Sequence, residues 1–300
     1  MLKRTLLFAN RCKLTLKNGQ MCYSESGNDV NSDRIIPLED IGFVMLESQC
    51  VTITTALLQA LVKNNTAVIL CDETHHPVAL MQSLTGNSTH NETLRYQLEA
   101  GVPLKKRIWK DIVAAKINNQ ADLLEVCGLQ GSERLKSYAA CVKSGDPDNR
   151  EGQSAKFYWS QLFGDRDFTR ERNGSMPNAL LNYGYAILRA AAARALVCSG
   201  LYCALGVHHH NRYNSFCLVD DFMEPYRPFV DRKVYTIVQN HKTIERITPD
   251  LKKELLDILT VDVCFKTRKR PLMVGLSESS AALARCIRNE SRTLCFPTLM

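Results

Sequence analysis

Histidines and carboxylates lie close together between residues 206 and 228 of this 300-residue chain. Histidine occupies positions 208–210, and Asp220, Asp221 and Glu224 follow soon after. Asp221 and Glu224 are three residues apart, a spacing that puts two side chains on one face of a helix. Imidazole nitrogens and carboxylate oxygens form a mixed ligand set for a divalent ion that stabilises phosphoryl oxygens or activates an oxygen nucleophile. The segment therefore predicts the centre of a metal-dependent phosphodiester enzyme.

The acidic residues also have a purely structural interpretation. They could form the exposed face of a helix, with Arg227 as the surface partner of one acid, and such an ion pair contributes little stability. The neighbouring positions, however, are apolar: Phe216, Leu218, Val219, Phe222, Met223 and Tyr226. Much of the segment must then be buried, and buried carboxylates need a metal, an arginine or a proton as a partner. A metal satisfies several of them at once, which favours the functional interpretation.

Residues 1–86 are expected to form a small β-rich domain. The segment 13–17 alternates polar and apolar residues and runs into Asn18-Gly19, a dipeptide typical of two-residue hairpin turns. Further strands are expected at 35–38, 41–46 and 67–71, and one short helix within 52–63, where apolar residues recur at helical spacing.

The polar, turn-rich segment 85–91 marks a domain boundary, beyond which the periodicity becomes helical. Residues 87–300 are expected to form a larger, mainly α-helical domain, so the predicted fold class is α+β. Its helices are expected over residues 104–124, 149–163, 177–198, 230–238, 251–259 and 277–289.

Composition narrows the class of protein without identifying it. Hydrophobic content of 45% and charged content of 23% are those of an ordinary globular protein, and the net charge of +7 points only weakly to a polyanionic partner. The basic clusters at 105–110 and 266–270 suit either phosphate binding or solvated surface.

Twelve cysteines without a Cys-x-x-Cys pair, and no secretory signal, indicate an intracellular, reduced chain. The longest apolar tract contains Arg189 and Arg194, which argues against a membrane span.

Several motifs resemble those of one known family. They are Gly206-Val207-His208-His209, the segments 211–216 and 218–231, and the supporting segments 10–14, 103–109, 149–158 and 177–185. Together they resemble the CRISPR-associated adaptation endonuclease and integrase, which inserts new spacers into CRISPR arrays, and they are most similar to the type II form.

The resemblance implies a metal site that binds Mg²⁺ or Mn²⁺ through Glu151, His209 and Glu224. Asp221, one turn before Glu224, would act as a supporting catalytic carboxylate. The local pattern alone would not single out Glu151, because the first turn of a helix favours a carboxylate without any function. The family's histidine lies three residues after a glycine, which from Gly206 selects His209 over the flanking histidines.

The resemblance also implies the partners. Residues 1–86 would form a β-rich dimerisation domain, and residues 87–300 the helical catalytic domain. The homodimer would assemble with a small second CRISPR adaptation protein into a hetero-hexamer. This complex would act on double-stranded DNA, both the spacer precursor and the CRISPR repeat, in the prokaryotic cytoplasm. In type II systems the effector nuclease and an accessory ring protein also take part.

Two alternatives stay open at this point. A catalytically inactive DNA-binding scaffold of the adaptation complex would bind DNA without strand transfer. A zinc hydrolase of a small substrate would also use histidine and carboxylates, although the chain lacks a His-Glu-x-x-His helix.

Overall fold

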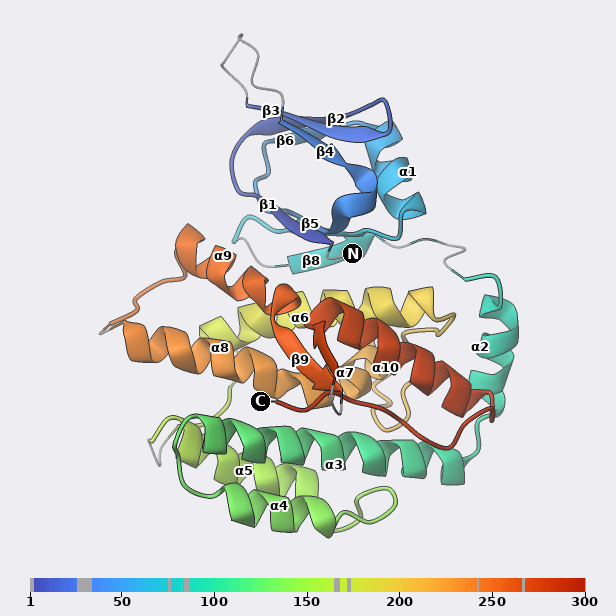
Figure 1. The fold of residues 1–300 in the computed structure, drawn as a ribbon, viewed down its shortest axis with the longest axis vertical. Coiled ribbons are helices and arrows are strands. Elements are labelled where there is room, and N and C mark those ends of the chain that lie inside the picture. Colours follow the sequence, from blue (N-terminus) through green and yellow to red (C-terminus); the bar gives the residue numbers. More distant parts are fainter. Residues whose placement is uncertain are drawn as a thin grey trace. The chain divides into compact units, whose positions relative to one another are not determined.

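The computed structural model describes residues 3–25, 34–74, 77–81, 83, 87–164, 168–171, 174–241, 243–265 and 268–299. The chain divides into two compact units, residues 1–86 (unit 1) and residues 87–300 (unit 2). Strands dominate unit 1 and helices dominate unit 2 (Figure 1). The predicted α+β class, with N-terminal strands and a larger helical portion, is confirmed.

The described residues of unit 1 form two four-stranded sheets. The first has the order β1 (Arg4–Phe8), β5 (Ile41–Leu46), β7 (Ala67–Cys71), β8 (Pro77–Met81). The second has the order β4 (Arg34–Pro37), β3 (Gln20–Glu25), β2 (Cys12–Lys17), β6 (Val51–Ile53). The 3₁₀ turn η1 (Leu38–Asp40) connects β4 to β5. The expected hairpin joins β2 to β3, with Asn18 and Gly19 both at positive φ (51° and 73°), as a type I′ turn requires.

A hydrophobic core lies within the described part of unit 1. It combines side chains from both sheets and from helix α1 (Thr55–Lys63), including Leu14, Met21, Val44 and Leu57. The helix predicted within 52–63 begins later than its apolar spacing suggested. Ile53 is extended in β6, and the hydroxyl of Thr54 caps α1 by accepting from the backbone N–H of Leu57. An N-cap threonine at this point ends the strand and starts the helix.

Unit 2 contains most of the helical structure. Its elements are α2 (His90–Glu99), α3 (Val102–Val126), α4 (Ser132–Ala140), α5 (Arg150–Leu162), α6 (Asn178–Cys198), α7 (Cys217–Met223), η2 (Glu224–Tyr226), α8 (Arg227–Asn240), α9 (Pro249–Leu256), η3 (Asp257–Thr260), β9 (Asp262–Phe265), β10 (Arg268–Pro271) and α10 (Leu272–Ile287). The expected helices are present with small shifts at their ends. The antiparallel pair β9–β10 was not predicted, because β10 is basic and lacks the alternation of a half-buried strand.

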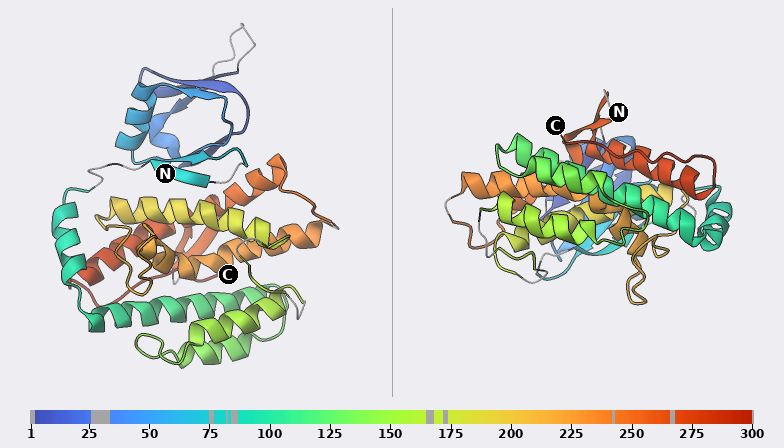
Figure 2. Two further views of the ribbon diagram at one scale, coloured as in Figure 1. Left: turned by 180° about the vertical axis from the view of Figure 1, so that it is seen from behind. Right: turned by 90° about the horizontal axis from the view of Figure 1, so that it is seen from below.

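Two helices organise unit 2. Helix α6 is buried along most of its length and packs against α7, α8, α9 and α10 (Figure 2). Gly184 permits the close approach of α8, since a Cβ there would lie 2.5 Å from Cγ1 of Val230. Helix α3 lies beside α4 and α5 (Figure 1). It also packs against η2, which carries Glu224, so its buried face meets a segment with a predicted ligand.

The apolar tract does not produce a membrane helix. Throughout the described ranges, no helix combines the length and the apolar composition needed to cross a bilayer. Arg189, which interrupts the tract on α6, forms an ion pair with Asp220 on α7. The twelve cysteines all lie in the described ranges, and none of them forms a disulfide bond.

Candidate active site

Glu151 stands at the start of α5, where the chain is held by two capping side chains. The Asp146 carboxylate accepts hydrogen bonds from the backbone N–H groups of Arg150 and Glu151, at 2.8 and 2.9 Å. Asn149, in the left-handed region at φ 50°, accepts from the N–H of Gly152. Both caps satisfy N–H groups that a helix start leaves unpaired. They therefore fix the direction of the first turn, from which the half-buried Glu151 carboxylate projects.

His209 lies in the loop between α6 and α7, and Asp221 holds it there. Nδ1 of His209 lies 2.5 Å from Oδ1 of Asp221. The same carboxylate accepts from the backbone N–H groups of Val207, His208 and His209. Because the carboxylate is an acceptor, Nδ1 carries the hydrogen, which leaves Nε2 with a lone pair available to a metal. The hydrogen bond to Asp221 raises the pKa of His209 above its ordinary value, although burial opposes this.

Gly206 makes the tight loop possible. A Cβ at this position would lie 2.3 Å from the backbone oxygen of His209 and 3.0 Å from Oδ2 of Asp221. No side chain fits between these atoms. The glycine that selects His209 in the sequence is therefore also the residue that lets the loop close over Asp221.

Glu224 begins η2, directly after α7, and is buried. Its Oε1 lies 2.8 Å from Nε of Arg227, so Arg227 pairs with an acid inside the unit rather than at the surface. Burial alone would raise the pKa of Glu224, but the charges of Arg227 and Lys116 outweigh this and lower the pKa below its ordinary value. Glu224 is thus kept ionised, as a metal ligand must be.

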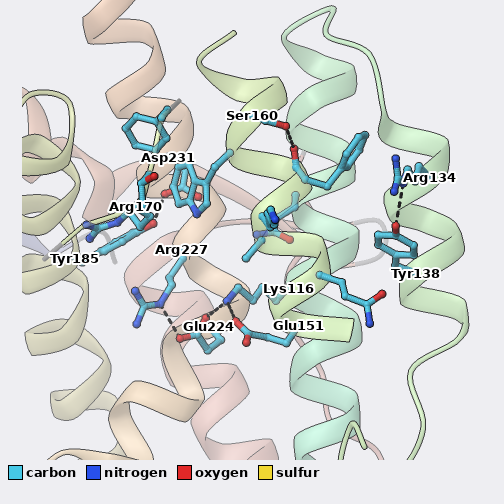
Figure 3. Close-up of a pocket in the computed structure, with 18 residues that line it drawn as sticks. Lys116, Arg134, Tyr138, Glu151, Ser160, Arg170, Tyr185, Glu224, Arg227 and Asp231 are labelled. Carbon is cyan, nitrogen blue, oxygen red and sulfur yellow. Dashed lines mark hydrogen bonds and ion pairs between the residues drawn. The ribbon is translucent and has the colours of Figure 1, made fainter. Parts of the chain in front are cut away.

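The ammonium group of Lys116 on α3 lies between the two glutamates (Figure 3). Nζ forms an ion pair with Oε1 of Glu151 and lies 2.5 Å from Oε2 of Glu224. The Lys116 side chain is only 9% exposed. Burial lowers the pKa of Lys116, but the two carboxylates raise it more, so the net shift is upward and the group stays charged. Carboxylates from α5 and η2 therefore meet at one cation position.

The described residues fit a metal site only in part. No group of three His, Cys, Asp or Glu side chains within these residues is arranged to hold a metal ion. The chemistry of the donors suits Mg²⁺ or Mn²⁺, since Glu151 and Glu224 supply carboxylate oxygens and His209 supplies an imidazole nitrogen. Oε2 of Glu224 is buried, and the cation that it contacts is the ammonium of Lys116. A buried carboxylate oxygen in that state is suited to a cation.

The other acid and histidines of the motif have structural surroundings. Asp220 accepts hydrogen bonds from Arg189 and from the side chain of Asn214, so the structural interpretation holds for this carboxylate. His208 stacks on Trp109 of α3, with ring centroids 4.0 Å apart and planes 3° apart. Burial lowers the pKa of His208. His210 is exposed. These contacts distinguish His209, whose ring is the one held by Asp221.

Sequence reasoning missed the contribution of α3. Trp109 packs against both His208 and His209, and Lys116 contacts both glutamates. Asn119 donates from its side chain to the backbone oxygen of Pro225 at 2.7 Å, directly after Glu224. One signal was present: Lys116 falls on the apolar face of α3, three and four residues after Val113 and Ile112. A charged residue on such a face indicates a buried partner.

A pocket of about 930 Å³ opens beside the glutamates. Basic and aromatic side chains line it, including Arg134, Lys156, Trp159 and Arg170. Asp231 also faces it, and accepts from the hydroxyls of Tyr158 at 2.9 Å and Tyr185 at 2.5 Å. Burial raises the pKa of Asp231 to about 7, against the lowering effect of these hydrogen bonds.

The fold and the site define a class of protein: an α+β molecule whose helical unit gathers two glutamates around one cation position beside an oriented histidine. A model of the family described as CRISPR associated protein Cas1 matches residues 6–254, and the chain belongs to this family. The chain is 38% identical over 264 residues to the CRISPR-associated endonuclease Cas1 of Neisseria meningitidis serogroup C, covering 88% of this chain and 85% of that protein. The family predicted from the motifs is thereby confirmed.

Solved structures share the fold at low sequence identity. A casposase bound to its integration product superposes with a TM-score of 0.78 at 19% identity, covering 98% of this chain and 92% of that chain. A Cas1 protein from Thermotoga maritima has a TM-score of 0.78 at 16% identity, covering 97% and 99% of the two chains. A Cas6-RT-Cas1–Cas2 complex contains a similar fold, with a TM-score of 0.72 at 19% identity, covering 96% of this chain and 35% of that chain.

Proposed function

We propose that this Cas1 family member is the endonuclease and integrase of CRISPR adaptation, with Glu151, His209 and Glu224 as ligands of Mg²⁺ or Mn²⁺. One observation carries the proposal: Glu151 and Glu224, from separate helices, meet at a position already occupied by a positive charge. Paired carboxylates that share one cation are the usual protein contribution to a Mg²⁺ site in phosphoryl transfer.

The reaction is a transesterification. The 3′-hydroxyl oxygen of the spacer precursor bonds to phosphorus in the CRISPR repeat, the bond to the leaving 3′-oxygen breaks, and the hydroxyl proton passes to solvent. When bound, the divalent ion polarises the phosphate and stabilises charge on the leaving oxygen. Two such events, one at each end of the repeat, complete an insertion.

Other residues of the chain orient the proposed metal ligands. Asp221 keeps Nδ1 of His209 protonated and its ring fixed, so that Nε2 faces away from the carboxylate. Arg227 keeps Glu224 ionised and oriented from the side opposite Lys116. The basic and aromatic side chains of the neighbouring pocket suit a DNA backbone and its bases.

The assembly is proposed from the family. Unit 1 serves as the dimerisation domain and unit 2 as the catalytic domain. The homodimer binds a small second CRISPR adaptation protein in a hetero-hexamer, a proposal supported by the Cas1–Cas2 complexes among the similar folds. In a type II system the effector nuclease and the accessory ring protein join it, in the prokaryotic cytoplasm.

The test is strand transfer of a short 3′-hydroxyl duplex into a supercoiled plasmid that carries a CRISPR repeat. The partner protein is present, and Mn²⁺ is compared with EDTA. Wild type is expected to form products only with Mn²⁺, and Glu151→Ala, His209→Ala and Glu224→Ala to lose at least about a hundredfold in rate. His210→Ala, at an exposed position outside these contacts, is the matched control.

The two alternatives predict different results in the same assay. Retained integration in all three ligand variants would contradict the site assignment. DNA binding without products under any condition favours the inactive scaffold. Zinc-dependent hydrolysis of a small ester, with no affinity for DNA, favours the zinc hydrolase.

A further inference from the structure

Lys116 makes a contact that the proposed reaction does not use. Its ammonium bridges a half-buried carboxylate on α5 and a buried one in η2 (Figure 3). Arg227 pairs with Glu224 at Oε1, whereas Lys116 contacts Oε2. The Lys116 contact brings Glu151 and Glu224 to opposite sides of one positive group.

A metal held by both glutamates would compete with Lys116 for these carboxylates. The ammonium contacts one oxygen of each glutamate, so a divalent ion held by both carboxylates would compete with Nζ of Lys116 for them. Two cations cannot share this space, and their repulsion at so short a distance is strong in a partly buried site. Metal binding therefore requires the ammonium to leave.

We propose that Lys116 is a positioning residue that acts as an internal substitute for the metal. It holds Glu151 and Glu224 at the spacing of the cation site while the metal is absent, and it competes with the divalent ion for that site. The inference rests on the proposed function, since it assumes that these two glutamates bind the metal. The affinity of the site for the metal would then depend on Lys116, a residue that is not itself a ligand.

Two consequences follow from the charges. Without Lys116 and without metal, no ammonium lies between the carboxylates of Glu151 and Glu224. The two negative charges are then less well compensated, so unit 2 is less stable. The same change leaves the site more negative and without a competitor, so a divalent ion binds more tightly. A merely structural lysine predicts the opposite second result, because a loosened pair of ligands binds metal more weakly.

Calorimetric titration with Mn²⁺ tests the proposal on three full-length proteins: wild type, Lys116→Gln and Lys156→Gln. Lys156 is the matched control, because it lines the same pocket and is exposed. The K116Q protein is expected to bind Mn²⁺ about tenfold more tightly than wild type, or more, and to gain more thermal stability from Mn²⁺. The K156Q protein should stay within about twofold of wild type, as expected for a screened surface charge.

A second measurement needs no variant. The wild-type chain is treated with acetic anhydride in Mn²⁺ or in EDTA, and lysine acetylation is read by peptide mass spectrometry. Acetylation of Lys116 is expected to rise several-fold in Mn²⁺, while that of Lys156 stays equal. This result supports the proposal even if K116Q fails to fold.

The outcomes separate the two proposals. Equal or weaker Mn²⁺ binding by K116Q, or acetylation of Lys116 that Mn²⁺ does not change although wild type binds the ion, overturns the role of Lys116 and leaves the metal site intact. Failure of all three proteins to bind Mn²⁺ overturns the metal site, and this inference with it.

Discussion

Asp221 lies completely buried with its Oδ1 2.5 Å from Nδ1 of His209, and its two oxygens also accept three backbone N–H groups of the preceding loop. The carboxylate therefore fixes both the ring and the loop that carries it. This explains why Asp221 and Glu224, three residues apart, have different tasks. Asp221 organises the histidine loop, and Glu224 projects toward Lys116 and Arg227.

Asp221→Asn is expected to lose both stability and strand transfer. An amide at this position turns one oxygen into a donor that faces backbone donors, so the free energy of unfolding should fall by about 2–4 kcal/mol. Urea unfolding followed by tryptophan fluorescence measures this for unit 2, since both tryptophans, Trp109 and Trp159, lie there.

Asp220→Asn is the matched control, because its partner Arg189 is partly exposed. Asp220→Asn should lower the free energy of unfolding by about 1 kcal/mol or less and should retain strand-transfer activity. Equal effects of the two substitutions would show that Asp221 has no special role in placing His209.

Substitutions of Glu151 and Glu224 should differ in their effect on the free energy of unfolding. The Glu224 side chain is 7% exposed and sits between two cations, so Glu224→Gln leaves those cations poorly paired and should cost about 3–5 kcal/mol in unfolding free energy. The Glu151 side chain is 31% exposed, and Lys116 keeps Glu224 as a partner when Glu151 is changed. Glu151→Gln should therefore cost about 1 kcal/mol or less.

Both variants should nevertheless lose strand transfer. Urea unfolding and the plasmid assay, run on the same preparations, make the comparison. An active Glu151→Gln protein of wild-type stability would remove Glu151 from the ligand set.

The sequence contained most of the local structure but only part of the site. The Asn18-Gly19 turn and the helical spacing of the later segments are local signals, and they gave the class and most elements correctly. The three histidines, Asp221 and Glu224 lie in one continuous motif, so spacing brought them together, but only the family resemblance selected His209. Glu151 came only from the family resemblance, because a carboxylate in a first helical turn has an ordinary structural explanation.

The contacts of Lys116 and Trp109 could not be predicted in this way. Their partners lie far away in the sequence, and only tertiary packing decides which side chain of α3 meets which glutamate or histidine. The pair β9–β10 was missed for a related reason, because β10 has no strand pattern of its own and its contacts are with β9 and α10. Local periodicity predicts which face of an element is buried, not what it is buried against.

We expect His208 to have a structural role, in contrast to the proposed metal ligand His209. Its ring stacks on Trp109, and burial lowers the pKa of His208, so it is neutral at pH 7. His208→Ala is expected to cost about 1 kcal/mol through the lost ring contact, while strand transfer stays within about threefold of wild type. The plasmid assay and urea unfolding measure the two effects. Loss of transfer at full stability would instead make His208 a ligand.

Asp231 should make the stability of unit 2 depend on pH. Its pKa is raised to about 7 in the folded chain by burial, against an ordinary value of 3.8. The folded state therefore binds more protons than the unfolded state between these values, and the contribution of Asp231 to stability falls as pH rises through that window. Above about pH 7 the buried charge costs a few kcal/mol.

Asp231→Asn keeps an oxygen for the hydroxyls of Tyr158 and Tyr185 but has no charge to bury. Relative to wild type, the variant should be near neutral at pH 5 and more stable at pH 8, as measured by urea unfolding at both pH values. Glu133→Gln is the control, since that side chain is 92% exposed and its loss should change stability by less than about 0.5 kcal/mol at either pH. A D231N protein equally destabilised at pH 5 and pH 8 would mean that the carboxylate is not titrating in this range, and that the two tyrosines need an ionised partner.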